Sequence, residues 1–298
     1  MNTLNILKTS IVMAAYNGTR FILEQLQSIA DQTRAPDEVI VIDDASTDDT
    51  REIVAAFIQT NRLAHWRLIC NSQNQGWRKT FKQGFEEARG EFIFPCDQDD
   101  IWMPDKIERM TDILENDPQI LLLSAEFKPL YNQEHGFQPF HPGLLASMRF
   151  DGTVERVHLG HNWAQTLCSG CLSGFRRALF QRIRESWIDR YSYDFQLRNY
   201  ALALDGFYSV HFNALLRRRH GANATFQERS ETLLYRIEAE IDALGNLLRF
   251  VETEEICGEK ARWFRDALLQ ARHRYASAKS RDRSFAHSRI SRRRGIRR

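Results

Sequence analysis

The sequence predicts an α/β fold in which helices flank a mainly parallel central sheet, followed by a helical extension at the C-terminus. Short apolar runs alternate with helical patterns through the first 125 residues. In addition, carboxylates follow two of the apolar runs directly, at the strand ends where such sheets bind their ligands. The composition, 43% hydrophobic and 27% charged, is typical of a soluble globular chain.

Each strand is predicted from an apolar or β-branched run, and each helix from an apolar stripe with helical spacing. The turn signal Tyr16-Asn17-Gly18 separates the first strand from the first helix. Ser46 or Thr47 is suited to cap the second helix, and Gly90 closes the third. The predicted strands cover residues 9–15, 39–42, 66–70, 92–95 and 120–124, and the helical patterns cover 21–29, 53–58, 79–88 and 104–114.

The segment Cys96-Asp97-Gln98-Asp99-Asp100 is the most informative in the chain, because it places three carboxylates within four residues after a predicted strand. Bringing these charges together costs free energy unless a cation or hydrogen-bond donors offset them. Oxygen ligands favour Mg²⁺ or Mn²⁺, ions that usually serve phosphate chemistry. The alternative is a solvated acidic turn leading into a helix at Pro104. The segment alone leaves both interpretations open.

A second acidic pair, Asp43 and Asp44, ends the second predicted strand. Both clusters are therefore expected at one edge of the sheet, where a nucleotide and its metal could bind. The sequence has neither a Gly-x-Gly-x-x-Gly fingerprint nor a Walker lysine loop, which argues against a dinucleotide enzyme and a P-loop NTPase. A phosphoaspartate receiver would use the Asp pair, but it would leave the cluster at 97–100 without a role.

Three segments together resemble the family 2 glycosyltransferases of the GT-A fold: residues 10–17 (SIVMAAYN), 41–48 (VIDDASTD) and 96–106 (CDQDDIWMPDK). The Asp-Gln-Asp-Asp-Ile-Trp version is most similar to rhamnosyltransferase-like members, which act on bacterial surface polysaccharides. The resemblance covers residues 8–125 well and 160–226 more weakly. It implies inverting transfer of a sugar, such as rhamnose, from a dTDP- or UDP-sugar to a hydroxyl of a glycan or lipid-linked acceptor.

The resemblance also implies a donor and metal site. Asp97, Asp99 and His220 would hold Mg²⁺ or Mn²⁺, with Asp97 also facing the ribose, and Asp44 or Asp43 would accept a hydrogen bond from the base. Helix capping is the structural alternative for Asp44, and ordinary surface charge is the alternative for two basic residues of the loop at 74–79. The other residues implied in donor binding are Ala14, Tyr16, Asn74, Gly76, Arg78, Lys79 and Arg219.

The acceptor side is implied by a weaker match. Asp194 corresponds to the general base that deprotonates the attacking hydroxyl, while Gly170, Cys171 and Tyr193 would form part of the acceptor wall. This segment departs from the family pattern, because Tyr193 replaces the common His or Glu and Phe195 the common Trp. Asp194 could instead simply complement the dipole at the start of a helix.

The predicted domains are a catalytic region at 1–226, divided into a nucleotide-sugar half (1–125) and an acceptor half (126–226), a helical extension at 227–280, and a disordered basic tail at 281–298. Residues 271–298 carry a net charge of +10, which leaves −8 for the rest of the chain. We expect the tail to bind an anionic membrane surface, since each basic residue near such a surface contributes about 1 kcal/mol. Nucleic-acid binding through the same tail is the non-enzymatic alternative, but it does not explain the acidic clusters.

Cysteine usage and the N-terminus predict a cytoplasmic protein, peripheral at the inner membrane face if the tail binds lipid. Five cysteines do not indicate a disulfide scaffold, and no signal peptide or long apolar segment is present at the N-terminus. A zinc site is the weaker alternative, because its four candidate ligands have no supporting Cys/His repeat. These candidates are His158, His161, Cys168 and Cys171.

Overall fold

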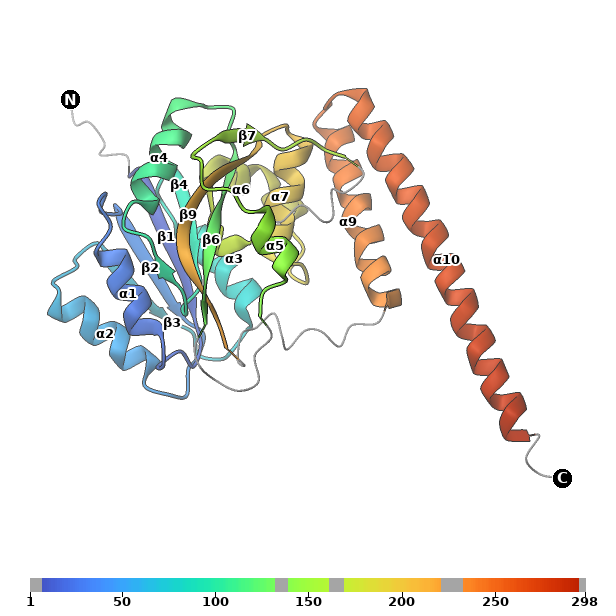
Figure 1. Cartoon of the computed structure of the whole chain (residues 1–298), viewed down its shortest axis with the longest axis horizontal. Coiled ribbons are helices and arrows are strands. Elements are labelled where there is room, and N and C mark those ends of the chain that lie inside the picture. Colours follow the sequence, from blue (N-terminus) through green and yellow to red (C-terminus); the bar gives the residue numbers. More distant parts are fainter. Residues whose placement is uncertain (1–6, 132–138, 161–168, 221–232, 295–298) are drawn as a thin grey trace. The chain divides into compact units, whose positions relative to one another are not determined.

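The structure, a computed structural model, describes residues 7–131, 139–160, 169–220 and 233–294. The chain divides into two compact units, residues 1–221 and 222–298. The first unit contains a nine-stranded sheet (Figure 1). Eight of its strands follow the order β3-β2-β1-β4-β8-β6-β9-β5, and the ninth, β7, pairs with β9. Its strands are β1 (Thr9–Ala15), β2 (Glu38–Asp43), β3 (Trp66–Cys70), β4 (Phe92–Cys96), β5 (Ile101–Trp102), β6 (Leu122–Tyr131), β7 (Val154–Arg156), β8 (Ser173–Arg176) and β9 (Phe207–Arg219).

Helices and two short 3-10 turns connect these strands and cover the sheet (Figure 1). The helices of the first unit are α1 (Ile22–Ala30), α2 (Thr50–Thr60), α3 (Trp77–Glu87), α4 (Lys106–Asn116), α5 (Pro142–Ser147), α6 (Arg177–Ile183) and α7 (Tyr193–Ala203), and the 3-10 turns are η2 (Gly170–Leu172) and η3 (Arg184–Ser186).

The N-terminal half of the sheet is parallel, as predicted. Strands β3, β2, β1 and β4 are neighbours, and every residue of β2 and β4 is buried, which explains their continuous apolar runs. In the register, Met13 of β1 pairs with Cys96 at the end of β4, and Ala15 pairs with Asp43 at the end of β2. The loops that carry the two acidic clusters therefore leave the sheet at the same edge.

The second half of the sheet is mixed. Strand β8 lies antiparallel between β4 and β6, whereas β9 runs parallel to β6 and antiparallel to β5 and β7. Strand β9 was not predicted, and β6 extends to Tyr131 instead of ending near residue 124. Its pairing with β9 shifts register between Ser124 and Phe127, and this irregularity interrupts the alternation that would have indicated a long strand.

The second unit consists of two helices, α9 (Leu233–Thr253) and α10 (Gly258–Arg294). The predicted apolar stripe of α9 is buried at Leu244 and Leu247, and α10 contributes the buried Phe264 and Leu268. The helices contact one another extensively. Among the residues that the structure describes, no helix combines the length and apolar character needed to cross a bilayer.

The predicted disorder of residues 281–298 differs from the structure, in which α10 remains helical as far as Arg294. The physical reason lies in the composition of α10, which has no Pro and no Gly after its first residue and is rich in Ala and Arg, two residues with high helix propensity. Residues 295–298 of the predicted tail lie outside the described residues.

Candidate active site

The edge at which β1, β2 and β4 end is held together by side chains that bind backbone groups of neighbouring loops. The amide of Gln98 makes two hydrogen bonds to the backbone of Tyr16, accepting from its N–H at 2.9 Å and donating to its carbonyl at 3.0 Å. Asn17, at φ 47°, accepts from the Thr47 N–H at 2.8 Å, and Gly18 donates to the Thr50 hydroxyl at 2.7 Å. The loops after β1, β2 and β4 thus form one connected rim.

The two aspartates after β2 have different partners. Asp43 accepts from the N–H of Ser46 at 3.0 Å and closes its own turn. The Asp44 carboxylate, 2% exposed, accepts from the side chain of Asn71 and the backbone N–H of Gly76, both at 2.8 Å. Asp44 caps neither α2 nor α3, whose N-cap residues are Asp49 and Gly76; its carboxylate instead holds the loop that leads into α3.

The central observation at this rim joins two residues that are 121 positions apart. The Asp99 carboxylate oxygen Oδ2 lies 2.7 Å from His220 Nε2, and the imidazole packs against the ring of Phe21 at 4.8 Å. His220 is 7% exposed and follows directly after β9. The structure therefore brings together two of the three predicted metal ligands. The predicted supporting residues Gly221 and Asn223 lie outside the described residues.

This pair fits a divalent cation. Carboxylate oxygen and imidazole nitrogen are both ligands for Mn²⁺, and two neighbouring ligands about 2.1 Å from an octahedral ion lie roughly 3 Å apart. The 2.7 Å separation between Asp99 and His220 would have to widen only slightly. Without an ion, the imidazole N–H can donate to the carboxylate instead.

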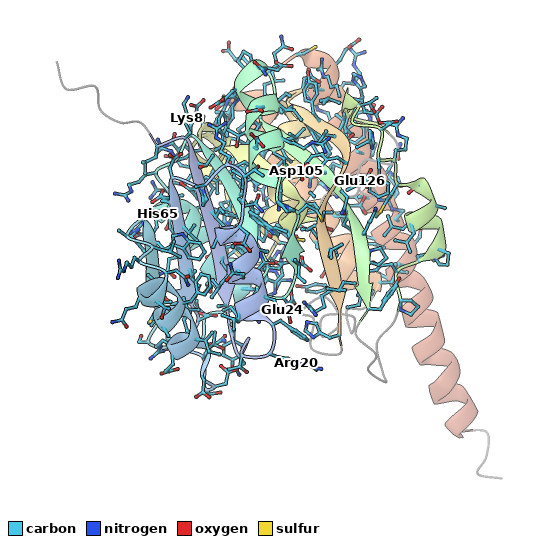
Figure 2. All side chains as sticks on the ribbon, turned by 60° about the vertical axis from the view of Figure 1, so that its left-hand side comes forward. Lys8, Arg20, Glu24, His65, Asp105 and Glu126 are labelled. Carbon is cyan, nitrogen blue, oxygen red and sulfur yellow. The ribbon has the colours of Figure 1, made fainter. Side chains whose placement is uncertain are left out.

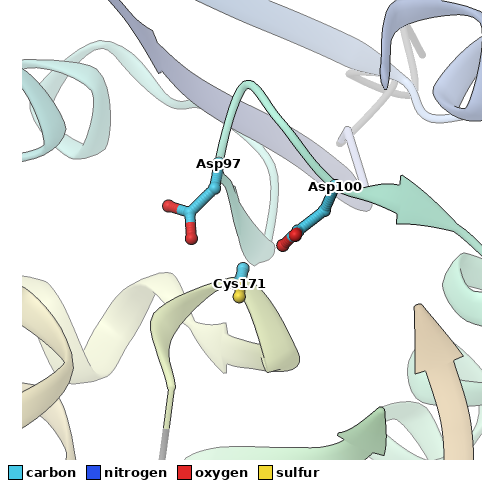
Figure 3. A group of neighbouring side chains, drawn as sticks. All are labelled: Asp97, Asp100 and Cys171. Atoms are coloured by element: carbon cyan, nitrogen blue, oxygen red, sulfur yellow. The ribbon is translucent and has the colours of Figure 1, made fainter. Parts of the chain in front are cut away.

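A second acidic group lies on the other side of the loop. Asp97 and Asp100 both project towards Cys171 of η2 (Figure 3), and one ligand atom from each of the three lies within 4.8 Å of the others. Burial, reinforced by the charge of Asp99, raises the pKa of Asp97 to about 6, and the same two causes raise the pKa of Asp100 to about 8. The loop thus holds more negative charge than its surroundings stabilise.

Asp100 does not cap the following helix α4, whose N-cap residue is Asp105. Its Oδ1 accepts from the backbone N–H of Arg218 at 2.8 Å and thereby fixes the end of β9. Its Oδ2 is buried and has no hydrogen-bond partner in the described structure. Because Asp100 is 2% exposed, Oδ2 is a buried acceptor, which is unusual in folded proteins.

Two cations near this group were not predicted as site residues. Lys106 is completely buried and donates to the carbonyl of Cys171 at 2.6 Å, while Arg217 donates to the Ser169 hydroxyl at 2.8 Å. Burial would lower the pKa of Arg217, but the neighbouring acid groups, Cys171 first and then Asp100, hold it above its usual value.

The three consecutive arginines of β9 alternate between faces, as the period of a strand requires. Arg217 and Arg219 both lie over the ring of Phe140, at 5.8 and 4.0 Å. Arg218 faces the other way, lying 4.5 Å from the ring of Phe21 and pairing with Glu24 at 2.7 Å. Figure 2 shows Glu24 and Arg20 at the end of the sheet opposite Lys8, which precedes β1. Because successive side chains of a strand lie on opposite faces, Arg219 and Arg218 contact different partners.

Asp194 lies in the first turn of α7, and the charge of its carboxylate is one of those that raise the pKa of Asp97. The two carboxylates are therefore close enough to interact, although they are 97 positions apart. Asp194 Oδ1 accepts from the Phe195 N–H at 2.8 Å, so the residue also stabilises the start of its helix.

Tyr193 and Gly170 have packing contacts that limit their role in acceptor binding. Tyr193 is 4% exposed and packs against Phe81 of α3 at 4.3 Å. A Cβ added to Gly170 would lie 1.9 Å from the Tyr193 hydroxyl oxygen, so glycine is needed there for close approach. Little of the Tyr193 ring is therefore accessible to an acceptor.

The remaining predicted donor residues surround the rim. Ala14 is half-buried near the end of β1, whereas Tyr16 is 44% exposed. In the loop before α3, Asn74 is exposed and Gly76 has a φ of 88°, a conformation that favours glycine. Lys79, in the first turn of α3, is also exposed. Arg78, in the first turn of α3, lies 4.5 Å from the ring of Trp77.

The described part of the chain contains no supported zinc site at the alternative residues. His161 and Cys168 lie outside the described residues, and Cys171 faces Asp97 and Asp100. The cysteines that the structure describes are free: Cys70, Cys96, Cys171 and Cys257.

Comparison with known families explains this arrangement. The family model described as glycosyl transferase family 2 matches residues 10–184, which is more than half of the chain. The chain belongs to glycosyltransferase family 2. An uncharacterized glycosyltransferase of Nostoc sp. is 30% identical over 109 residues, covering 37% of this chain and 33% of the relative. A putative teichuronic acid biosynthesis glycosyltransferase of Bacillus subtilis, TuaG, is 29% identical over 105 residues, covering 35% and 41%.

Solved structures show that this member of family 2 has the GT-A fold, as the sequence predicted. S. aureus TarS in complex with UDP-GlcNAc aligns with a TM-score of 0.65 and 18% identity over 91% of this chain and 73% of TarS. The mannosyltransferase PcManGT of Pyrobaculum calidifontis, in complex with GDP-Man and Mn²⁺, aligns with a TM-score of 0.57 and 16% identity over 95% and 81%. The matched segments span only 27 to 45% of the curated relatives' own lengths.

Proposed function

We propose that this chain is an inverting, metal-dependent glycosyltransferase that moves a sugar from a nucleoside diphosphate to a hydroxyl of a surface-polysaccharide or lipid-linked glycan acceptor. The contact between Asp99 and His220 carries this proposal, because it assembles an oxygen and a nitrogen ligand at the edge where the donor loops meet. The teichuronic acid relative and the nucleotide-sugar complexes of the structural neighbours support it. Rhamnose from a dTDP donor is our specific proposal for the sugar.

Asp99 and His220 would hold Mg²⁺ or Mn²⁺, with Asp97 beside them. When bound, the ion would neutralise the charge that develops on the departing diphosphate. Asp97 faces the ribose in this assignment, and Asp100 keeps β9 and its terminal His220 in place through the Arg218 N–H. Arg219 adds a cation at the same strand end, where it can contact the diphosphate.

The donor would lie against the rim formed by the loops after β1 and β2. Ala14 and Tyr16 lie at the end of β1, and Asp44 has a carboxylate that already accepts from Asn71 and Gly76. A carboxylate offers about four acceptor positions. The Gln75 N–H also lies 3.2 Å from both Asp44 oxygens, so three donors already bind this carboxylate and a ring N–H of uracil or thymine would take the remaining position. The loop before α3, with Asn74 and Gly76, and the first turn of α3, with the cations Arg78 and Lys79, complete the proposed donor site.

The acceptor would approach from the side of η2 and α7. Gly170 and Cys171 supply small or buried groups there, and Asp194 is positioned at a helix start near Asp97. As general base, the Asp194 carboxylate takes the proton of the attacking hydroxyl while the bond to the diphosphate breaks. Inversion follows from a single displacement, since no covalent intermediate is involved.

A panel of nucleotide sugars tests the function. We expect one of UDP-GlcNAc, dTDP-rhamnose and GDP-mannose to raise the melting temperature when Mn²⁺ is present, because a bound ligand stabilises the folded state. The same donor is expected to release its nucleoside diphosphate during incubation with Mn²⁺. An absence of stabilisation and of release for every donor, by protein that is folded by circular dichroism, would contradict the proposal.

We also propose that the basic end of α10 binds an anionic membrane surface and so holds the enzyme near a lipid-linked acceptor. The support is the net charge of +10 over residues 271–298, of which residues 271–294 belong to α10. Deleting residues 281–298 is expected to abolish flotation with vesicles that contain phosphatidylglycerol, and to leave binding to neutral phosphatidylcholine vesicles unchanged. Equal flotation of the full chain and the truncated chain would reject the membrane proposal without affecting the enzymatic one.

A further inference from the structure

Lys106 is a buried charge to which the proposed reaction assigns no role. Among the lysines that the structure describes, it alone is buried, with 0% of the residue exposed. It is the first residue of α4, where most charged side chains would point into solvent. Because a buried ammonium group is unfavourable without specific partners, the contacts of Lys106 indicate what it holds in place.

These contacts join two separate parts of the site. The Lys106 Nζ lies 3.4 Å from the centre of the Trp102 ring, which belongs to the strand that follows the acidic loop. The same ammonium donates to the carbonyl of Cys171 at 2.6 Å. Lys106 therefore connects the acidic loop at 97–100 with η2, which lies on the proposed acceptor side.

The turn η2 contacts both the acidic loop and the helix start that carries the proposed base, Asp194. Cys171 Sγ lies within 4.8 Å of carboxylate oxygens of Asp97 and Asp100 (Figure 3), and Gly170 lies against Tyr193, the residue before Asp194. A shift of this turn would consequently move the proposed acceptor wall relative to the acidic loop. Arg217 binds the preceding residue, Ser169, and is a second cation on the same turn.

We propose that Lys106 is a positioning residue, whose ammonium fixes η2 against the acidic loop and so aligns the acceptor side of the site with the donor side. This inference rests on the proposed function for its effect on transfer. The direct contacts of Lys106 are with Trp102 and Cys171, and Asp97 and Asp100 act on it through their charges, so transfer should depend on it far more than donor and metal binding do. Misplacement of reacting groups by about 1 Å can lower turnover on the order of 10²-fold.

The variant Lys106→Met tests this role, since it keeps the length of the side chain and removes the charge and the hydrogen bond. We expect nucleoside diphosphate release from the panel donor to fall on the order of 10²-fold, while calorimetry with UDP or dTDP and Mn²⁺ shows unchanged affinity. Iodoacetamide labelling of Cys171 in the folded protein, followed by peptide mass spectrometry, should become faster. Lys8→Met is the matched control, because Lys8 is paired with Glu91 at the opposite end of β1 (Figure 2).

Two results would overturn the proposal. One is a rate of Cys171 labelling in Lys106→Met that equals the wild-type rate, because the position of η2 would then not depend on Lys106. The other is a loss of UDP or dTDP affinity as large as the loss of turnover, which would place Lys106 in the donor site. If Lys106→Met does not fold, Trp102→Phe and Lys106→Arg are measured in the same way and should show smaller changes in the same direction. A wild-type chain without turnover would contradict the proposed function, whereas Cys171 labelling would still decide the position of the turn.

Discussion

Replacing Asp194 by Asn is expected to abolish most sugar transfer while leaving donor binding intact. The amide oxygen of Asn can still accept from the Phe195 N–H, so the start of α7 should be preserved. The amide cannot take a proton from the acceptor hydroxyl. Since general base catalysis typically contributes about 10²–10⁴-fold, turnover should fall by a factor in that range. The measurement is the initial rate of transfer with the donor identified in the panel.

The matched control is Asp189→Asn, which removes a carboxylate from the segment just before α7. Asp189 pairs with Lys82 at 3.0 Å and is 45% exposed, so its loss should change stability by only about 0–1 kcal/mol and leave turnover unchanged. Wild-type turnover in Asp194→Asn would mean that another group deprotonates the acceptor. Equal losses in both variants would instead indicate that the region around α7 is disturbed.

Replacing Asp99 by Ala is expected to remove the dependence of donor binding on the metal. The substitution deletes the oxygen that lies 2.7 Å from His220 and leaves the imidazole without its carboxylate partner. In wild-type protein, Mn²⁺ should increase the stabilisation by UDP or dTDP in thermal unfolding, and in Asp99→Ala this increase should disappear. Metal stabilisation of the departing charge is worth several kcal/mol, so turnover should fall on the order of 10³-fold.

Asp105→Ala provides the control for this variant. Asp105 belongs to the same segment, but 45% of its side chain is exposed and its ion pair with Arg109, at 3.4 Å, is partly solvated. Such pairs contribute about 0–1 kcal/mol, so metal-dependent stabilisation should persist. If Asp99→Ala responded to Mn²⁺ as wild type does, the alternative group of Asp97, Asp100 and Cys171 would have to be considered as the metal site.

The fold could be predicted where strands are buried on both faces. The apolar residues of β1, β2 and β4 are almost all fully buried, so their runs are visible without a structure. Strand β9 could not be predicted, because it ends in three arginines that would be expected in solvent. In the structure Arg218 is buried and Arg217 and Arg219 are half-buried, because they pack on rings from distant segments, such as Phe21 and Phe140, which sequence spacing cannot reveal.

The candidate site could be predicted only in part, because its contacts also join distant segments of the chain. Family resemblance named Asp99 and His220, and the structure confirms that they meet, although they come from a loop and a strand end 121 residues apart. Lys106 was missed because lysine at a helix start usually lies on the surface, and its partner is a backbone carbonyl that carries no sequence signal. Tyr193 was placed near an acceptor because the aromatic cluster around α3 could not be foreseen.

Calorimetric titration of the wild-type protein with UDP or dTDP, in Mn²⁺ and again after treatment with EDTA, tests the central claim most directly. The Asp99 and His220 pair predicts that affinity for the nucleotide falls by at least about tenfold, or 1.4 kcal/mol, when the ion is removed. Addition of Mn²⁺ in excess of EDTA should restore it. The same affinity with and without the ion would contradict a metal-dependent donor site at this edge of the sheet.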